Sequence, residues 1–387
     1  MRAVHLSLTD YRNYAEAEVA LAPGPNLFVG PNGQGKTNLV EALGYLSSLG
    51  SHRVSQDSAL IRQGHDSAII RARLAHRERE VLVELQLNRS RPNRAQINRA
   101  AVRPREVPRY FSSILFAPED LSLVRGDPAG RRRFLDELLI QRTPRLTGVL
   151  SDYERVLKQR NTLLKSARSR GIAGDQLSTL EIWDERLVSL GTEIITERER
   201  LCLLLTEPVR SAYEAVAGAD HGLELIPRLS IEGRGEDDAE ATTSDEPDVP
   251  DSERTRLQFR EALVRLRRSE LDRGVSLAGP HRDDLFLGLN RLPAKGYASH
   301  GESWSFALAL KLGAADLLRR ESASGDPVLI LDDVFAELDQ SRRRRLADAV
   351  RDYEQVLITA AVFEDVPEEL VAHTVHIRGG RIIDEPA

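Results

Sequence analysis

The sequence predicts an α/β fold whose central sheet is built from both ends of the chain, with a helical lobe inserted between them. Short apolar runs alternate with helical patterns in residues 1–127 and again in residues 274–387. In residues 128–273 the apolar residues instead recur with the helical period. We therefore expect one α/β domain that is interrupted in sequence by a helical insert.

Composition indicates a protein of a reducing compartment. The single cysteine, Cys202, excludes an internal disulfide and a cysteine-rich metal site. The chain shows no signal peptide and no apolar run near the roughly 20 residues that span a bilayer. We therefore expect a soluble, cytoplasmic protein with no membrane contact. The segment Glu232–Asp251 holds nine acidic residues and one arginine, and we expect a disordered acidic loop at about residues 232–252 because little there can be buried.

The N-terminal segment predicts strands that surround one helix. Apolar and polar residues alternate on both sides of the turn Tyr11–Tyr14, which predicts a pair of strands. A helix is expected at Thr37–Leu49, where apolar residues fall on one face. Further strands are expected at Asn26–Val29, Ser67–Leu74, Glu80–Asn88 and Ser113–Phe116.

The stretch Gly30–Thr37 fits the pattern G-x-x-x-x-G-K-[ST] between a predicted strand and a predicted helix, the context of a phosphate-binding P-loop. Backbone N–H groups of such a loop and the helix dipole cradle phosphate oxygens. Lys36 can reach the outer phosphates, and Thr37 offers a hydroxyl to Mg²⁺. The ordinary alternative is a glycine-rich turn with an exposed lysine. The predicted nucleotide contacts here are Gly30, Pro31, Asn32, Gly33, Gln34, Gly35, Lys36, Thr37 and Asn38.

The inserted segment predicts several helices. One opens at Pro128, and two apolar stripes follow, from Val149 to Leu163 and from Trp183 to Leu205. Because Gly171–Gly174 separates the stripes, they fit a short antiparallel, coiled-coil-like hairpin. They fit the buried faces of a compact helical domain equally well. A further helix is expected after the acidic segment, around Phe259–Leu271.

The C-terminal segment supplies the second half of a nucleotide site. The apolar strand Val328–Leu331 ends in Asp332 and Asp333, a Walker B pattern. In a parallel sheet this tip lies beside the P-loop, where Asp332 can hold Mg²⁺ and Asp333 can orient or deprotonate an attacking water. Such a strand end is common by itself, and the upstream P-loop makes it informative. We expect Lys36 and Asp333 to be the catalytic residues, although nearly 300 residues separate Lys36 from Asp332.

Two further motifs flank this strand. Ala298–Glu302 has the form Ser-x-Gly-Glu at the start of a predicted helix, where Ser299 and Gly301 can receive a γ-phosphate. The ordinary alternative is a helix cap in which Ser299 and Glu302 form a capping box. Ala336–Asp339 is similar to the D-loop of ABC-type ATPases, in which the signature contacts ATP bound to the other subunit. The order of the motifs predicts an ABC-type ATPase head, with Asp339 also near the nucleotide.

With these motifs the chain resembles the RecF recombination-repair family, close to the structural-maintenance-of-chromosomes (SMC) ATPases. The matching stretches span nearly the whole chain: Asp10–Tyr14, Gly30–Glu41, Ser51–Arg53, Phe116–Leu121, Gly279–Asp284, Ala298–Glu302 and Leu331–Asp339. The resemblance implies a protein of gap repair and replication-fork restart that acts after DNA damage, including the SOS response. It implies an ATP-dependent homodimer that binds double-stranded and gapped DNA without sequence specificity. It also implies RecR and RecO as partners in loading RecA, and a weak, DNA-stimulated ATPase that resets the dimer.

The chain departs from the family pattern at two positions. Glu302 replaces the glutamine common in the signature, and Thr359 stands where ABC-type proteins often have a switch histidine. We expect Thr359 to make a weaker γ-phosphate contact, in agreement with slow hydrolysis.

Clusters of arginine are the candidates for contacts with DNA phosphates. The first cluster comprises Arg89, Arg91, Arg94, Arg99, Arg103 and Arg105, the second is Arg131, Arg132 and Arg133, and the third is the run Arg342–Arg345. The ordinary alternative for each cluster is a solvated surface that does not contact DNA. Two other functions fit parts of the pattern: an ATPase subunit of another SMC-like or ABC-type assembly, including a transporter, or a metabolic P-loop kinase. A kinase would act as a monomer and would leave the signature and D-loop without a role.

Overall fold

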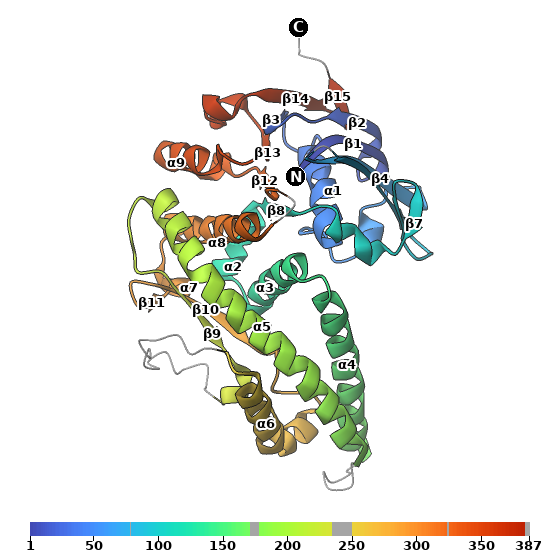
Figure 1. Ribbon diagram of the computed structural model, residues 1–387, viewed down its shortest axis with the longest axis vertical. Helices are drawn as coiled ribbons and strands as arrows, with labels where there is room; N and C mark the ends of the chain where they lie inside the picture. The colour runs from blue at the N-terminus through green and yellow to red at the C-terminus, as the bar shows by residue number, and fades with distance from the viewer. Residues whose placement is uncertain (78, 171–177, 234–249, 323–324, 384–387) are drawn as a thin grey trace. The chain divides into compact units, whose positions relative to one another are not determined.

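The computed structural model describes residues 1–77, 79–170, 178–233, 250–322 and 325–383 (Figure 1). The chain forms two compact units. The first comprises Met1–Arg125, Glu207–His221 and Tyr297–Ala387, and the second comprises Gly126–Thr206 and Gly222–Gly296. Relative to the segments predicted from sequence, Glu207–His221 groups with the two ends of the chain, and residues 274–296 group with the insert. Most of the predicted acidic loop, residues 234–249, lies outside the described residues.

One sheet of the first unit is antiparallel, with the strand order β2-β1-β4-β5-β6-β7. Alternation buries one face of it, so that Leu6 and Leu8 of β1 are 1% and 0% exposed. The strands are β1 (Arg2–Tyr11), β2 (Tyr14–Ala20), β4 (Ser67–His76), β5 (Arg79–Asn88), β6 (Arg94–Ile97) and β7 (Ala100–Val102).

The other sheet of this unit carries the sequence motifs, in the order β15-β14-β3-β13-β12-β8. Strands β8, β12, β13, β3 and β14 run parallel, and β15 is antiparallel to β14. The carboxyl ends of β3 and β12 therefore lie at one edge, where open α/β sheets bind ligands. The strands are β3 (Gly24–Val29), β8 (Ser113–Phe116), β12 (Val328–Asp332), β13 (Gln355–Ala360), β14 (His373–Arg378) and β15 (Arg381–Ile383).

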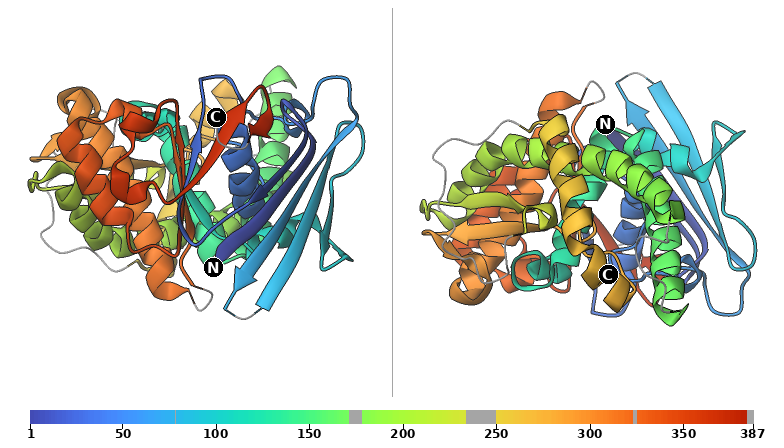
Figure 2. Two further views of the ribbon diagram at one scale, coloured as in Figure 1. Left: turned by 90° about the horizontal axis from the view of Figure 1, so that it is seen from above. Right: turned by 90° about the horizontal axis from the view of Figure 1, so that it is seen from below.

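Helix α1 (Lys36–Ser48) packs between these two sheets (Figure 2, left). Leu39, Leu43 and Leu46 share one hydrophobic core with strands of both sheets. Helix α8 (His300–Glu321) packs against β8, where the rings of Trp304 and Phe116 meet edge-on with centroids 5.5 Å apart. The unit also contains α2 (Leu121–Arg125), α9 (Gln340–Val350) and the C-terminal part of α5 (Ser178–Ala217).

The second unit combines helices with an antiparallel sheet in the order β11-β10-β9. The two apolar stripes lie on α4 and α5, and α6 joins them in one core that includes Tyr153, Val188 and Phe259. The inserted lobe is therefore a compact helical domain. Its elements are α3 (Pro128–Arg142), α4 (Leu146–Arg170), α5 as far as Thr206, β9 (Glu224–Arg228), α6 (Ser252–Arg273), β10 (Asp284–Leu289), β11 (Leu292–Pro293) and the short turn α7 (Ala294–Tyr297).

The hairpin β6–β7 was not predicted from the sequence. Asn98 and Arg99 form its tight turn with φ values of 49° and 68°. Ala95 and Ile97 are buried and alternate with the exposed residues Arg94, Gln96 and Asn98, but two buried residues are too few to reveal a strand in the sequence. No helix within the described ranges has the length and apolar character needed to cross a membrane.

A buried arginine ties together three segments of the second unit. Arg160 donates from Nε to Asp184 Oδ1 at 2.7 Å, from Nη1 to Ser276 Oγ at 2.7 Å and from Nη2 to Glu270 Oε2 at 2.6 Å. Arg160 and Glu270 are both 0% exposed. The ion pairs therefore replace the water that these charges lose on folding.

Replacing Arg160 with Met should lower the free energy of unfolding by about 3–5 kcal/mol, because Glu270 would stay buried without its cation. Urea unfolding followed by circular dichroism measures the change. The matched control is Arg155→Met, whose guanidinium is 70% exposed and pairs with Asp152; it should cost less than about 1 kcal/mol. Equal losses in the two variants would contradict the assignment.

Candidate functional site

The P-loop leaves the end of β3 and leads directly into α1. Gly30 lies so close to β14 that an added Cβ would sit 2.2 Å from the carbonyl oxygen of Ile377. Gly35 has a φ of 117°, and its Cβ would meet Asn13 Nδ2 at 2.7 Å. Both positions therefore require glycine. The loop leads into the N-terminus of α1, where backbone N–H groups can bind an anion.

The loop is held from outside by the turn that follows β1 and by the β14–β15 turn. Asn13 Nδ2 and the Gly380 N–H both donate to the carbonyl of Gln34, each at 3.0 Å. The Gly379 N–H donates to Gln34 Oε1 at 2.6 Å. Asn13 also accepts from Asn38 Nδ2 at 2.7 Å. Asn13 belongs to the stretch Asp10–Tyr14, whose role in the site was not predicted from the sequence.

Lys36 folds back over the P-loop. Its Nζ donates to the carbonyls of Gly30 at 2.7 Å and Pro31 at 3.2 Å and to Asn32 Oδ1 at 3.3 Å. Burial lowers the pKa of Lys36, while the charges of Asp333 and Asp332 act in the opposite direction. Its ammonium group is thus held among P-loop oxygens, close to the backbone that would surround a phosphate.

Asp332 joins the two halves of the predicted site. Its Oδ1 accepts from Thr37 Oγ1 at 3.0 Å and from Thr359 Oγ1 at 2.6 Å. Burial raises the pKa of Asp332, and the two hydroxyl bonds oppose that rise. The strand order explains the arrangement, because β13, which carries Thr359, lies between β3 and β12.

Thr359 lies at the end of β13 beside the Walker B strand, as predicted, but its hydroxyl has other partners than a γ-phosphate. Its hydroxyl donates to Asp332 and accepts from the Asp333 N–H at 2.9 Å, and its residue is 0% exposed. These bonds use the hydroxyl to brace the tip of β12, instead of leaving it free for a γ-phosphate.

Asp333 projects from a strained backbone position. Its φ is 56°, a left-handed value that is uncommon for a residue other than glycine. Its Oδ1 is buried and has no hydrogen-bond partner in the described part of the chain. An acceptor oxygen beside Asp332 and Lys36 is thus available to a water molecule or ligand.

The donor set at the tip of β12 fits Mg²⁺. Thr37 Oγ1 and Asp332 Oδ1 are hard oxygen donors 3.0 Å apart. The described ranges hold no group of three His, Cys, Asp or Glu side chains that could enclose a metal by themselves. Mg²⁺ suits such an open pair because it usually keeps water and phosphate oxygens among its ligands.

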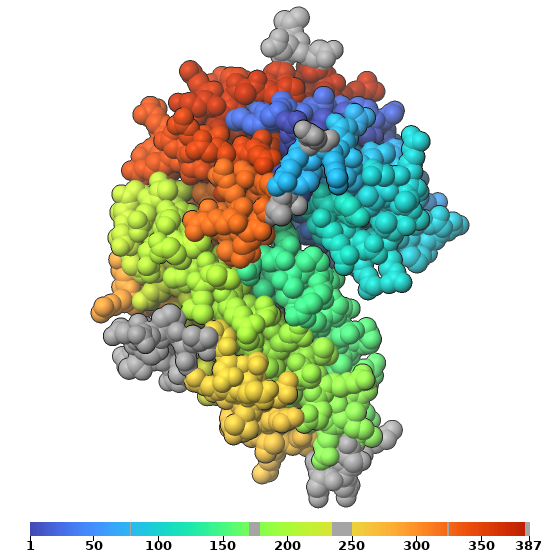
Figure 3. All heavy atoms as spheres, in the orientation of Figure 1, coloured from blue at the N-terminus to red at the C-terminus, as the bar shows by residue number. Residues whose placement is uncertain are grey.

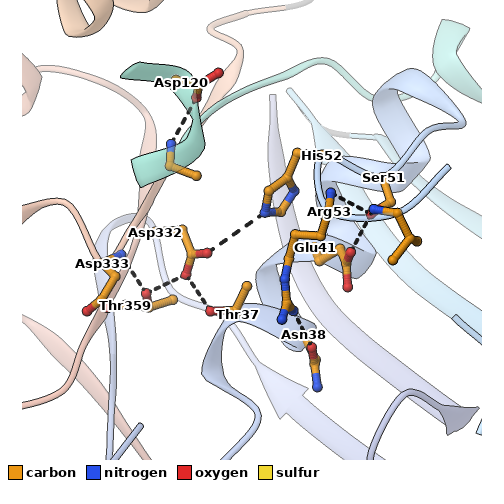
Figure 4. Close-up of polar contacts among 12 residues, drawn as sticks. Thr37, Asn38, Glu41, Ser51, His52, Arg53, Asp120, Asp332, Asp333 and Thr359 are labelled. Carbon is orange, nitrogen blue, oxygen red and sulfur yellow. Dashed lines mark hydrogen bonds and ion pairs between the residues drawn. The ribbon is translucent and has the colours of Figure 1, made fainter. Parts of the chain in front are cut away.

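The loop after α1 brings a histidine and an arginine to the same edge (Figure 4). His52 Nε2 is buried without a hydrogen-bond partner within the described residues and lies 4.0 Å from Asp332 Oδ2. Arg53 Nη1 donates to Asn38 Oδ1 at 2.9 Å. Both lie in the stretch Ser51–Arg53, which the sequence singled out without giving it a role.

A buried carboxylate anchors this loop. Glu41 of α1 is 1% exposed and accepts from Arg12 Nη2 at 2.6 Å and from Ser51 Oγ at 2.5 Å. Burial alone would raise the pKa of Glu41, but the bonds from Arg12 and Ser51 outweigh it and hold that pKa below its usual range. The anchor fixes where the following His52 and Arg53 can lie.

The signature and D-loop residues gather at the starts of α8 and α9. Ser299 and Glu302 form a capping box, with Ser299 N–H to Glu302 Oε2 at 2.8 Å and Glu302 N–H to Ser299 Oγ at 3.3 Å. Asp339 caps α9 by accepting from the Arg342 N–H at 3.0 Å. In the described chain, no hydrogen bond or ion pair joins Ser299, Gly301 or Asp339 to residues 30–38.

The arginines predicted to contact DNA fall into two groups. Arg89, Arg91 and Arg94 are exposed where β5 leads into β6. The segment β4–β7 forms the light blue to cyan part of the surface in Figure 3. Arg131 is 5% exposed and donates to both oxygens of Asp284, at 2.7 and 2.9 Å. Arg132 donates to the Asp283 carbonyl at 2.6 Å. The prediction is wrong for Arg131, whose buried guanidinium is taken up by Asp284. Arg132 is half-buried, and its contact with DNA stays a prediction.

Comparison with known proteins identifies the family. Residues 3–375 match the family described as "RecF/RecN/SMC N terminal domain". The chain is 66% identical to the "DNA replication and repair protein RecF" of Clavibacter michiganensis subsp. michiganensis, over 99% of this chain and 96% of that protein. It is 63% identical to the protein of the same name from Leifsonia xyli subsp. xyli, over 99% of this chain and 100% of that protein.

Solved structures support the same family and fold. The chain matches "Structure of the recombination mediator protein RecF-ATPrS in RecFOR pathway" with a TM-score of 0.86 and 26% identity, covering 98% of this chain and 97% of that one. An SMC head bound to the C-winged helix domain of ScpA matches with a TM-score of 0.53 and 14% identity, covering 99% of this chain and 97% of that one, and it supports the fold alone. The chain therefore belongs to the RecF family, and its fold is an ABC-type ATPase head with an inserted helical lobe.

Proposed function

We propose that this protein binds ATP with Mg²⁺ and then dimerises on DNA during recombinational gap repair and the restart of stalled replication forks. The hydrogen bond from Thr37 to Asp332 carries the proposal, because it unites the P-loop and the Walker B strand across 295 positions. That pairing provides an anchor for the phosphates and an anchor for the metal at one edge of a sheet.

The names of the relatives support the biological process. The proteins at 66% and 63% identity are named for DNA replication and repair, and the structural match is named for the RecFOR pathway. We extend these properties to this chain, with RecO and RecR as partners that help it load RecA in the bacterial cytoplasm.

The chemistry follows from the groups at the edge of the sheet. Lys36 and the P-loop N–H groups would bind the outer phosphates of ATP, and Thr37 and Asp332 would hold Mg²⁺, which neutralises phosphate charge. Asp333 is the group placed to accept a proton from the attacking water. Hydrolysis is proposed to be slow and DNA-stimulated, and it would end the ATP-bound state.

The dimer is inferred from the second group of motifs. Ser299, Gly301 and Asp339 lie at the starts of α8 and α9, and we propose that they contact ATP bound to a second copy. A metabolic kinase would use a monomer and would not need them. An ATPase subunit of another SMC-like or ABC-type assembly would share this dimer, so DNA binding separates that alternative from the proposed function.

Replacing Lys36 with Ala should abolish ATP binding and, with it, dimerisation, because the main positive charge of the P-loop is lost. Sedimentation velocity with and without ATP and Mg²⁺ measures the result: the wild type should form a dimer only with nucleotide. Lys158→Ala, on the exposed face of α4, is the matched control and should behave like the wild type. A wild-type monomer in saturating ATP would refute the dimer.

Asp333→Asn should retain ATP binding and lower hydrolysis by about 10²–10⁴-fold, since the amide cannot accept the proton from water. Single-turnover phosphate release measures the rate, and the ATP-bound dimer should persist longer. Asp352→Asn, at an 82% exposed side chain, should leave the rate unchanged. Wild-type turnover in the Asp333 variant would remove this residue from the reaction.

The proposed DNA-binding surface is the β5–β7 arginine patch, which comprises Arg89, Arg91, Arg94, Arg99, Arg103 and Arg105. All six are exposed, and none has an ion-pair partner among the described residues. Arginines without ion-pair partners along β5–β7 and the start of the short helix η2 (Pro104–Arg109) suit a phosphate backbone and provide no base-reading aromatic surface. We therefore propose that the patch follows duplex DNA without reading its sequence.

Replacing Arg89, Arg91 and Arg94 together with Ala should weaken DNA binding and reduce the slope of log K against log salt by about 2–3, because each lost phosphate contact contributes about 0.9. Fluorescence anisotropy with a gapped duplex at several salt concentrations measures the slope. Arg155, Arg260 and Arg268 are exposed helical arginines of the second unit, and their triple replacement is the control. An unchanged slope in the first variant would exclude the patch.

A further inference from the structure

Arg342 of α9 rests on the glycine of the signature. A Cβ added to Gly301 would lie 2.6 Å from both Nη1 and Nη2 of Arg342 and 2.9 Å from Cζ. The same side chain donates from Nη1 to Asp339 Oδ2 at 2.9 Å, and its backbone N–H donates to Asp339 Oδ1 at 3.0 Å. One arginine thus contacts both the signature, at the start of α8, and the D-loop, which precedes α9.

The signature also carries a carboxylate, which is unusual for a phosphate-binding surface. The bonds with Ser299 hold the pKa of Glu302 below its usual range, and the positive charge of Arg342 acts in the same direction. His221 Nδ1 lies 3.8 Å from Glu302 Oε1 and 2.7 Å from the Tyr213 hydroxyl. A carboxylate here would repel a phosphate unless nearby cations offset it.

Arg342 differs from the other arginines of its run. Arg343 Nε donates to the Leu338 carbonyl at 2.9 Å, and Arg345 Nη1 donates to the Ala217 carbonyl at 2.8 Å, so both serve the interior of the unit. Arg344 is exposed. The Nε–H of Arg342 is buried and has no hydrogen-bond partner among the residues that the structure describes. Arg342 therefore holds its guanidinium against the signature with one buried N–H that no described residue satisfies.

We propose that Arg342 is a positioning residue of the dimer: it fixes the signature to the D-loop and offsets Glu302, so that this surface accepts the terminal phosphate of ATP bound to a second copy. The inference rests on the proposed ATP-dependent dimer. It assigns to Arg342 a task in assembly that is separate from ATP binding by the chain's own P-loop.

Arg342→Ala should bind a fluorescent ATP analogue with the affinity of the wild type but weaken the ATP-dependent dimer on the order of tenfold or more, since Glu302 would face the phosphate uncompensated. Sedimentation at several protein concentrations measures dimerisation without DNA. Arg344→Ala, two positions along the same helix, is the matched control and should leave the dimer unchanged. A normal dimer in Arg342→Ala would overturn the inference and leave the proposed function standing.

A second comparison tests the charge itself. Glu302→Gln in the Arg342→Ala background should recover at least about threefold of the lost dimer affinity, because the uncompensated carboxylate is gone. No recovery would overturn the charge-offset role. Thermal unfolding of each variant separates a loss of fold from a loss of assembly. Arg342→Lys keeps the positive charge at this position, and it should dimerise more tightly than Arg342→Ala. A wild type that fails to dimerise with ATP would overturn both proposals.

Discussion

The rest of the site depends on one buried carboxylate that needs two hydroxyl donors. Asp332 obtains them from Thr37 on α1 and Thr359 on β13. These bonds require β3, β13 and β12 to lie side by side with their carboxyl ends together, so both ends of the chain must enter the same sheet. Everything inserted between them must leave this edge intact, and the compact helical unit meets that condition by carrying its own core.

The second unit also explains a motif that the sequence left without a role. Within Gly279–Asp284, Asp284 pairs with Arg131, Asp283 Oδ1 accepts from Ser230 Oγ at 2.8 Å, and His281 Nδ1 meets the Tyr153 hydroxyl at 2.8 Å. Burial lowers the pKa of His281 to about 4, so the ring is neutral at physiological pH and contributes hydrogen bonds to packing. The motif is a packing junction of the lobe.

At the signature helix, the structural role as a helix cap does not exclude the proposed functional role. Ser299 and Glu302 form the capping box that helix chemistry predicts, and Gly301 in the same turn lies against the Arg342 side chain. A run of four arginines has several roles: three of them bond or pack within the first unit, while Arg344 faces solvent. Like residues next to each other on a helix point in different directions, and only their neighbours decide their roles.

Local features could be predicted from the sequence because the forces behind them act over a few residues. The glycines of Gly30–Thr37, the apolar strand before Asp332 and the cap at Ser299 follow from backbone conformation, hydrophobic period and helix capping. Other contacts join residues far apart in the chain. They are the pairing of Arg131 with Asp284, the bonds of Thr359, the approach of His52 to Asp332 and the contact of Arg342 with Gly301. The tertiary structure alone decided them, because burial and long-range pairing determine which charges face solvent and which are already satisfied inside the protein. Among the arginine clusters this distinction is sharpest: composition treated Arg89 and Arg131 alike, and burial separated them.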